Sequence, residues 1–359
     1  KDKTNTILFD DFYKCLKSVN HKATKKFAID ILSEHTKKGL QMKQYNRKII
    51  LENGMEFYGY GFGAADSRVC ELVFNTSMVG YQEILSDPSY AFQAVVMTYP
   101  LIGNYGMAED DYESEKPVTG AMIVRDYNDE PSSWRSSKTL SEVMKQYDIP
   151  GISGIDTRQL TRIIRSEGTQ KVLITDVSTT ICHGLELLRQ TDIPRDAVAK
   201  VSVKEAQTYY PAVSASYGTV RRKNLHIAAI DCGMKRNIVR SFNERGCIVT
   251  VVPWNASPGE IEALNPDGIF ISNGPGNPAD VPETIQTIRY LTGRYPIFGI
   301  CLGHQIISLA YGAEPYKLKF GHRGGNHPVR NLETGKIEIT SQNHSYAVDK
   351  EIGRASCRE

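Results

Sequence analysis

Between residues 48 and 175, short apolar runs alternate with polar turns, a pattern typical of β-strands. The runs on either side of Asn53 and Gly54 predict a β-hairpin, because Asn-Gly favours the backbone angles of tight hairpin turns. Further strands are expected at residues 70–75, 94–98 and 120–124. This part of the chain is therefore predicted to be rich in strands.

A helix is predicted over residues 157–166. Asp156 precedes it and can accept hydrogen bonds from the first-turn N–H groups, and Gly168 follows it as a helix terminator. Together these elements predict a mixed α/β domain dominated by strands, which we place at residues 42–183.

From residue 224 the period changes to apolar strands separated by helical segments. Strands are expected in H-I-A-A-I-D, I-V-T-V-V-P-W, G-I-F-I-S-N-G and Y-P-I-F-G-I-C, with helices after Lys235, near Glu260 and near Ile285. Buried strands that alternate with helices predict a doubly wound, mostly parallel sheet, with ligands at the carboxyl ends of its strands. We place this second domain at 224–350 and a linker of looser, polar pattern at 184–223.

Both ends of the chain differ in character from these domains. Residues 1–41 are rich in lysine. The codons of Lys37, Lys38 and Gly39 could form a ribosome-binding site just upstream of the Met42 codon. We therefore expect translation to start at Met42 and residues 1–41 to be a non-native or upstream-translated extension. The alternative is a natural helical extension. Residues 351–359 resemble a translated sequencing adapter, so we expect the native sequence to end near Lys350.

The composition is typical of a globular protein and argues against nucleic-acid-binding and membrane-spanning proteins. With 359 residues, 40% hydrophobic and 23% charged, and a net charge of +2, the chain fits a globular protein of two domains and gives no sign of a nucleic-acid partner. No apolar run is long enough to cross a membrane, and we expect a cytoplasmic protein. The 7 cysteines are scattered and never form C-x-x-C, which argues against a disulfide framework or a metal site.

One cysteine has a special context. G-I-C-L-G-H-Q, residues 299–305, follows an apolar strand and opens a helix, which is the pattern of a nucleophile elbow with sulfur in place of oxygen. Gly299 and Gly303 permit the sharp turn that exposes Cys301. We expect the helix N-terminus to lower the pKa of the Cys301 thiol.

A second loop ends the preceding strand. S-N-G-P-G-N-P, residues 272–278, holds two glycines and a proline, so its backbone N–H groups are expected to be free. With the N–H of Leu302, such a loop can stabilise an oxyanion. Alone, a G-P-G turn is weak evidence, but beside the elbow it predicts an acyl-transfer site.

These two motifs resemble those of the class I, or triad, glutamine amidotransferases. F-G-H-R-G-G-N-H-P at 320–328 and Q-N-H-S-Y-A-V-D at 342–349 are similar to segments of carbamoyl-phosphate synthetase small subunits. The first domain agrees, because 74–90 (F-N-T-S-M-V-G-Y-Q-E-I-L-S-D-P-S-Y) and 151–162 resemble the N-terminal domain of that family, which other amidotransferases lack. The resemblance spans residues 42–350.

The resemblance implies that Cys301 attacks the carboxamide of glutamine and forms a glutamyl thioester, releasing ammonia to a large synthetase subunit. It implies no cofactor in this chain, and ATP and magnesium in the large subunit. It also implies a glutamine and oxyanion pocket formed by Ser77, Gly274, Gly276, Leu302, Gln305, Asn343, Ser345 and Tyr346. Ser345 stands where the family usually has glycine.

The family takes its base from a later H-P-E segment, and this sequence contains none. We therefore expect the second domain to be incomplete at its carboxyl end and the chain as given to be inactive. His304 follows the nucleophile but is expected to point along another face of the helix, and His322, His327 and His344 are expected to be structural. The alternatives are a non-catalytic docking subunit and the glutaminase of another amidotransferase, such as that of anthranilate or guanylate synthesis.

Overall fold

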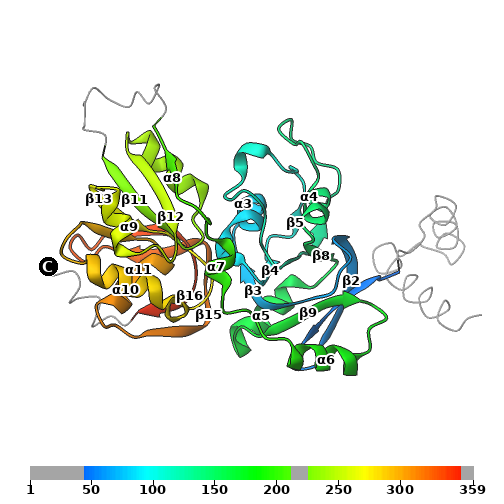
Figure 1. Ribbon diagram of the computed structural model, residues 1–359. Helices are drawn as coiled ribbons and strands as arrows, with labels where there is room; N and C mark the ends of the chain where they lie inside the picture. The colour runs from blue at the N-terminus through cyan, green and yellow to red at the C-terminus, as the bar shows by residue number, and fades with distance from the viewer. Residues whose placement is uncertain (1–43, 212–224, 349–359) are drawn as a thin grey trace, which may run out of the picture. The chain divides into compact units, whose positions relative to one another are not determined.

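The computed structural model describes residues 44–211 and 225–348, and from Asn46 onward they belong to one compact unit (Figure 1). The predictions for 1–41 and 351–359 lie outside the described residues. Within the described residues, no helix is both long and apolar enough to cross a membrane.

The first domain is built on a closed barrel with the strand order β1-β2-β8-β6-β4-β3-β9. Its strands are β1 (Arg47–Leu51), β2 (Glu56–Gly63), β3 (Arg68–Asn75), β4 (Gln93–Met97), β6 (Ala121–Ile123), β8 (Pro150–Ser153) and β9 (Lys171–Asp176). The barrel closes because β1 pairs antiparallel with both β2 and β9. The predicted strand-rich α/β domain is confirmed, although its closure into a barrel was not predicted.

The local signals in this domain are also confirmed. β1 and β2 form the predicted hairpin, in which Gly54 has φ 84° and donates to the carbonyl of Leu51 at 2.9 Å. Helix α5 (Thr157–Glu167) begins where Asp156 accepts from the N–H of Gln159 at 2.9 Å, and Gly168 follows its last residue.

Helices and short segments cover the barrel strands. They are α3 (Tyr81–Ser86), η1 (Pro88–Tyr90), η2 (Glu109–Asp111), α4 (Leu140–Gln146) and α6 (Ile181–Gln190), with a small sheet of β5 (Leu101–Ile102) and β7 (Asp126–Tyr127). Successive residues of β3 enter different apolar clusters, because strand side chains alternate between faces. Leu72 packs in a cluster with α5, and Val73 in one with α3 and α4.

The second domain contains a five-stranded sheet with the order β10-β12-β11-β13-β14. Its strands are β10 (Gln207–Tyr209), β11 (His226–Asp231), β12 (Ile248–Pro253), β13 (Gly268–Ile271) and β14 (Ile297–Gly299). The neighbours among β11 to β14 pair in parallel, as predicted, and β10 is an antiparallel edge strand. The predicted linker range 184–223 thus contains β10 and also α7 (Ala197–Val201).

Helices pack on both faces of this sheet, which confirms the doubly wound prediction. The helices are α8 (Arg236–Glu244), α9 (Pro258–Ala263), α10 (Pro282–Leu291) and α11 (Leu302–Ala310), with the short η3 (Pro278–Asp280). Ile261, Ile288 and Ile306 of α9, α10 and α11 enter one apolar cluster, whereas Phe242 of α8 packs against the opposite face.

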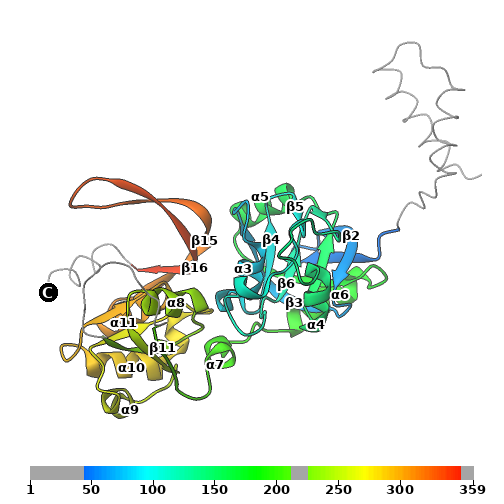
Figure 2. The same ribbon diagram turned by 90° about the horizontal axis from the view of Figure 1, so that it is seen from above.

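After α11 the chain forms a long antiparallel hairpin of β15 (Pro315–Arg330) and β16 (Ile337–Val348). The hairpin is a separate two-stranded sheet, which is seen apart from the five-stranded sheet in Figure 2. Its register sets Arg323 opposite Asn343. The described parts of the two family-like motifs near the end of the chain, 320–328 and 342–348, therefore lie on the two arms of one hairpin.

Candidate active site

Cys301 lies at the corner between β14 and α11, as the elbow pattern predicts. It has φ 55° and ψ −109°, a conformation that non-glycine residues rarely adopt and that is often found at functional sites. The turn needs glycine at Gly303, where a Cβ atom would lie 2.2 Å from the carbonyl oxygen of Ile271. The corner therefore packs directly against the end of β13.

The thiol of Cys301 is half-buried and donates to the carbonyl oxygen of Asn343 on β16 at 3.2 Å. The pKa of this thiol is raised to about 11, with burial as the largest cause and the carboxylate of Asp87 as the next. The N–H of Leu302 and the charges of Lys235 and Arg323 lower the pKa, but by less than burial raises it. The expectation of a lowered pKa was wrong because the loss of hydration outweighs the helix N-terminus.

A small cavity of about 20 Å³ adjoins the thiol, room for about one water molecule. Except for Ser77, every predicted site residue lines this cavity. These residues are Cys301, Gly274, Gly276, Leu302, Gln305, Asn343, Ser345 and Tyr346. A larger space of about 470 Å³ shares Gln93, Gly276, Ser345 and Tyr346 with it. Glutamine would need more room beside the thiol than this conformation provides.

Ser77 is the predicted residue that the fold does not bring to this cavity. It follows β3, where its N–H bonds to the side chain of Asn75 at 2.7 Å. Ser89 lines the cavity instead. A signal for it was present, because Ser89 lies in the same 74–90 segment that carried the family resemblance, in D-P-S-Y.

Two segments with backbone N–H donors line the cavity. The N–H of Leu302 interacts favourably with the ionised sulfur of Cys301. In the 272–278 loop, the N–H groups of Gly274 and Gly276 have no hydrogen-bond acceptor among residues 44–211 and 225–348. Gly274, Gly276 and Leu302 all line the cavity beside Cys301.

Arg323, which was not predicted from the sequence, is only 3% exposed and lines the cavity. It donates to the carbonyl of Phe320 at 2.7 Å and to the hydroxyl of Ser345, while its Nε atom has no partner within the described part of the chain. Ser345, which departs from the family's glycine, is thus held by a buried cation. Only the register of the hairpin brings these two residues together.

Histidines are near the site but none bonds to the sulfur among the described residues. His322 and His344 contact each other, Nδ1 to Nε2 at 3.1 Å, and burial lowers the pKa of both. His344 also bonds to the carbonyl of Tyr346 at 2.7 Å. These contacts fit the structural roles predicted for these two residues. No group of metal-binding side chains is found in the described ranges.

Comparison with known proteins matches each domain to a family model. The model "Carbamoyl-phosphate synthase small chain, CPSase domain" matches residues 49–174, and the model "Glutamine amidotransferase class-I" matches residues 228–357. The chain is 50% identical over 305 residues to a carbamoyl phosphate synthase small chain of Fusobacterium nucleatum, covering 85% of this chain and 82% of that one. It is also 50% identical over 302 residues to the carbamoyl phosphate synthase pyrimidine-specific small chain of Bacillus subtilis, covering 84% and 80%.

Proposed function

The chain belongs to the carbamoyl-phosphate synthase small-chain family, and from this premise we propose that its second domain hydrolyses glutamine with Cys301 as the nucleophile. The observation that carries the proposal is that Cys301, on a strained strand-to-helix corner, lines one cavity with Leu302, Gly274 and Gly276, and that the two glycine N–H groups have no acceptor within the described residues. A nucleophile and an oxyanion site placed together are the requirements for acyl transfer.

In the proposed reaction, the sulfur of Cys301 attacks the carboxamide carbon of glutamine. The carbonyl oxygen becomes an oxyanion, which the N–H groups of Leu302 and the glycine loop stabilise. The nitrogen takes up a proton and leaves as ammonia, so that a glutamyl thioester forms on Cys301. Water then attacks the thioester, which releases glutamate and restores the thiol.

The thiol must lose its proton before it attacks, and burial works against this step by raising the pKa of Cys301. Among the described residues no imidazole accepts that proton, and the carbonyl of Asn343 stabilises the protonated form. We therefore propose that the 359-residue chain alone hydrolyses glutamine no faster than its Cys301→Ser variant. Loss of one member of a catalytic triad costs about 10⁴-fold in rate.

The ammonia is proposed to serve a large-chain partner, because a small chain implies one. ATP and magnesium would act in that partner, and this chain needs no cofactor for the thioester chemistry. The partner is expected to bind the small chain whether or not Cys301 reacts.

The proposal is tested by labelling with a chloroketone analogue of glutamine, which alkylates a thiol inside a glutamine site. We expect the label on Cys301, identified by peptide mass spectrometry, and protection by glutamine but not by asparagine. A Cys301→Ser variant is the control for the other cysteines. Labelling that glutamine does not prevent would reject a glutamine site and favour the alternative of a docking subunit without catalysis.

A further inference from the structure

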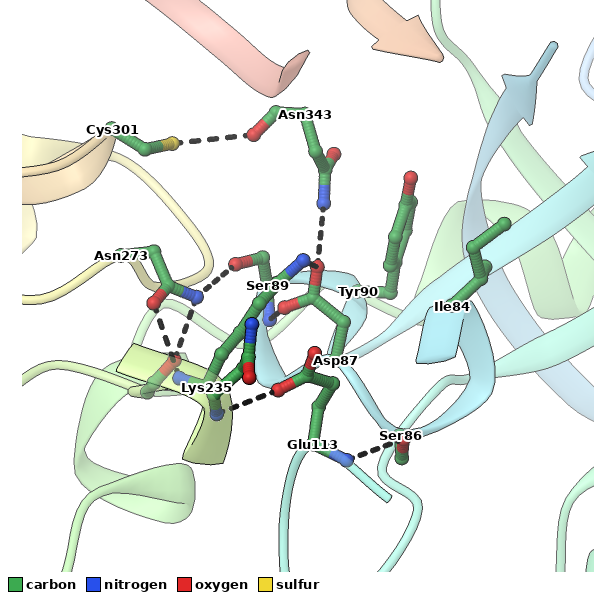
Figure 3. A network of polar contacts seen from close by, with 12 residues as sticks. Ile84, Ser86, Asp87, Ser89, Tyr90, Glu113, Lys235, Asn273, Cys301 and Asn343 are labelled. Atoms are coloured by element: carbon green, nitrogen blue, oxygen red, sulfur yellow. Dashed lines mark hydrogen bonds and ion pairs between the residues drawn. The ribbon is translucent and has the colours of Figure 1, made fainter. Parts of the chain in front are cut away.

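A series of polar contacts connects the first domain to the nucleophile (Figure 3). Asp87, between α3 and η1, has a side chain that is only 2% exposed. Its Oδ2 lies 3.0 Å from Nζ of Lys235 and accepts from Nδ2 of Asn343 at 3.4 Å. The carbonyl oxygen of Asn343 then accepts from the thiol of Cys301 at 3.2 Å. A carboxylate of the first domain is thus separated from the sulfur by one residue.

The other carboxylate oxygen of Asp87 holds Ser89, which also lines the cavity beside Cys301. Oδ1 accepts from the N–H of Ser89 at 2.9 Å, and the hydroxyl of Ser89 accepts from Nδ2 of Asn273 at 2.9 Å. The side-chain oxygen of Asn273 accepts from the N–H of Lys235 at 3.2 Å. Asp87, Ser89, Asn273 and Lys235 therefore form a closed ring of polar contacts, which the ion pair of Asp87 and Lys235 completes.

Burial of a carboxylate this deep is strongly unfavourable unless a cation and hydrogen-bond donors compensate it. Lys235, at the N-terminus of α8 in the second domain, is the cation that does so for Asp87. Loss of either partner would therefore change both the charge near the site and the position of Asn343. This makes the pair suited to control a nearby reactive group.

We propose that Asp87 and Lys235 are positioning residues of the glutaminase site, which hold Asn343 against the thiol of Cys301 and so let the first domain control the reactivity of the nucleophile. The inference rests on the proposed function in one respect, that Cys301 is the nucleophile. It adds a role for the first domain in the chemistry of the second.

The two partners act on the thiol with opposite signs. After burial, the carboxylate of Asp87 is the largest influence that raises the pKa of Cys301, and the ammonium of Lys235 and the guanidinium of Arg323 both lower it. Removing the charge of Asp87 should increase the thiolate fraction, and removing that of Lys235 should decrease it. Loosening of the structure would instead change both variants in the same direction.

The test is the alkylation of Cys301 in the full chain by iodoacetamide, a neutral reagent, followed by mass spectrometry of the peptide that contains Cys301. Asp87→Asn and Lys235→Met are compared with the unaltered chain between about pH 7.5 and 9.5. Glu262→Gln is the control, since it breaks the partly exposed pair of Glu262 with Arg294, 3.2 Å apart and outside this network.

We expect Asp87→Asn to react about threefold to tenfold faster at each pH, and Lys235→Met to react slower by a similar factor. A shift of half to one unit in pKa changes the thiolate fraction by about these factors. The profiles should be parallel and displaced along the pH axis, and Glu262→Gln should coincide with the unaltered chain. Equal rates in all proteins, or acceleration in both variants, would overturn the inference.

Circular dichroism checks the fold of each variant, because either change leaves one member of the pair without its partner. Should Lys235→Met fail to fold, Asp87→Asn decides the question by itself; should Asp87→Asn fail to fold, the question is decided by Lys235→Met. A slower rate in this variant supports the inference, and an unchanged or faster rate rejects it. Alkylation needs no glutamine, so its outcome is separate from the labelling test of the proposed function.

Discussion

The side-chain amide of Gln305 donates to the carbonyl oxygen of Tyr346 at 2.8 Å. This contact joins α11, the helix that follows Cys301, to β16 of the hairpin. Gln305 is only 5% exposed. The position of Asn343, three residues before Tyr346, depends on the same strand. Gln305 therefore helps to keep the hairpin over Cys301.

We expect Gln305→Met, which keeps the size of the side chain but removes the donor, to loosen β16. A buried hydrogen bond contributes about 1 kcal/mol, so amide hydrogen exchange in residues 341–348 should accelerate about fivefold. Gln190→Met, which removes an exposed contact with Glu186 in α6, is the matched control. Unchanged exchange in 341–348 would show that the hairpin is held by other contacts.

Gly303→Ala should destabilise the second domain. The new Cβ atom would lie 2.2 Å from the carbonyl oxygen of Ile271, so the backbone of β13 or of the elbow must move, at a cost of about 1–3 kcal/mol. Gly259→Ala is the control, because no atom lies within 4 Å of its added Cβ and alanine favours the helix α9. Urea unfolding midpoints should fall for the first variant and stay or rise slightly for the second.

The reactivity of Cys301 should keep rising with pH. Because the pKa of its thiol is raised to about 11, the alkylation rate should increase about tenfold per unit between about pH 7 and pH 9.5. The proton is bound more tightly in the folded state than in the unfolded chain, so the stability it provides is lost as the pH rises toward 11. A rate that levels off near pH 8.5 would contradict the raised pKa.

The ion pair of Lys317 and Glu71, 2.9 Å apart, joins β15 to the barrel strand β3. Burial raises the pKa of Glu71, but Lys317, Arg323 and Gln93 together hold it below its usual value. Since the Lys317 side chain is 48% exposed, a double-mutant cycle with Glu71→Gln and Lys317→Met should give a coupling of no more than about 1 kcal/mol.

That coupling should be present above about pH 4.5 and disappear as the pH falls through the lowered pKa of Glu71, because the protonated acid no longer attracts the ammonium. Thermal unfolding of the two single variants and the double variant at several pH values between about 7 and about 2 measures it. A coupling that stays constant over this range would show that the contact is not electrostatic.

Local features were predictable because their causes are local. The hairpin turn at Gly54, the cap of α5 by Asp156, the individual strand and helix segments of the second domain and the corner at Cys301 all depend on residues close together in the chain. A short pattern of glycine, polar and apolar residues is enough to specify each of them.

The site as a whole was predicted less completely. Ser89 and Arg323 line the cavity but were not predicted from the sequence, and Ser77 was predicted for the site but does not line the cavity. Ser89 is distant in sequence from Cys301, and Arg323 reaches the cavity only through its register opposite Asn343. No local pattern encodes contacts of this kind.

The sequence by itself determined the two domain types, the succession of strands and helices along the second domain, and the glycine-flanked corner that holds Cys301. Tertiary structure decided the closure of the barrel, the hairpin over Cys301, the contact of Asp87 with Lys235 and the raised pKa of the thiol. The physical reason is that hydration and charge around a side chain depend on groups that only folding brings near it. A helix N-terminus can be read from neighbouring residues, but the burial that outweighs it cannot.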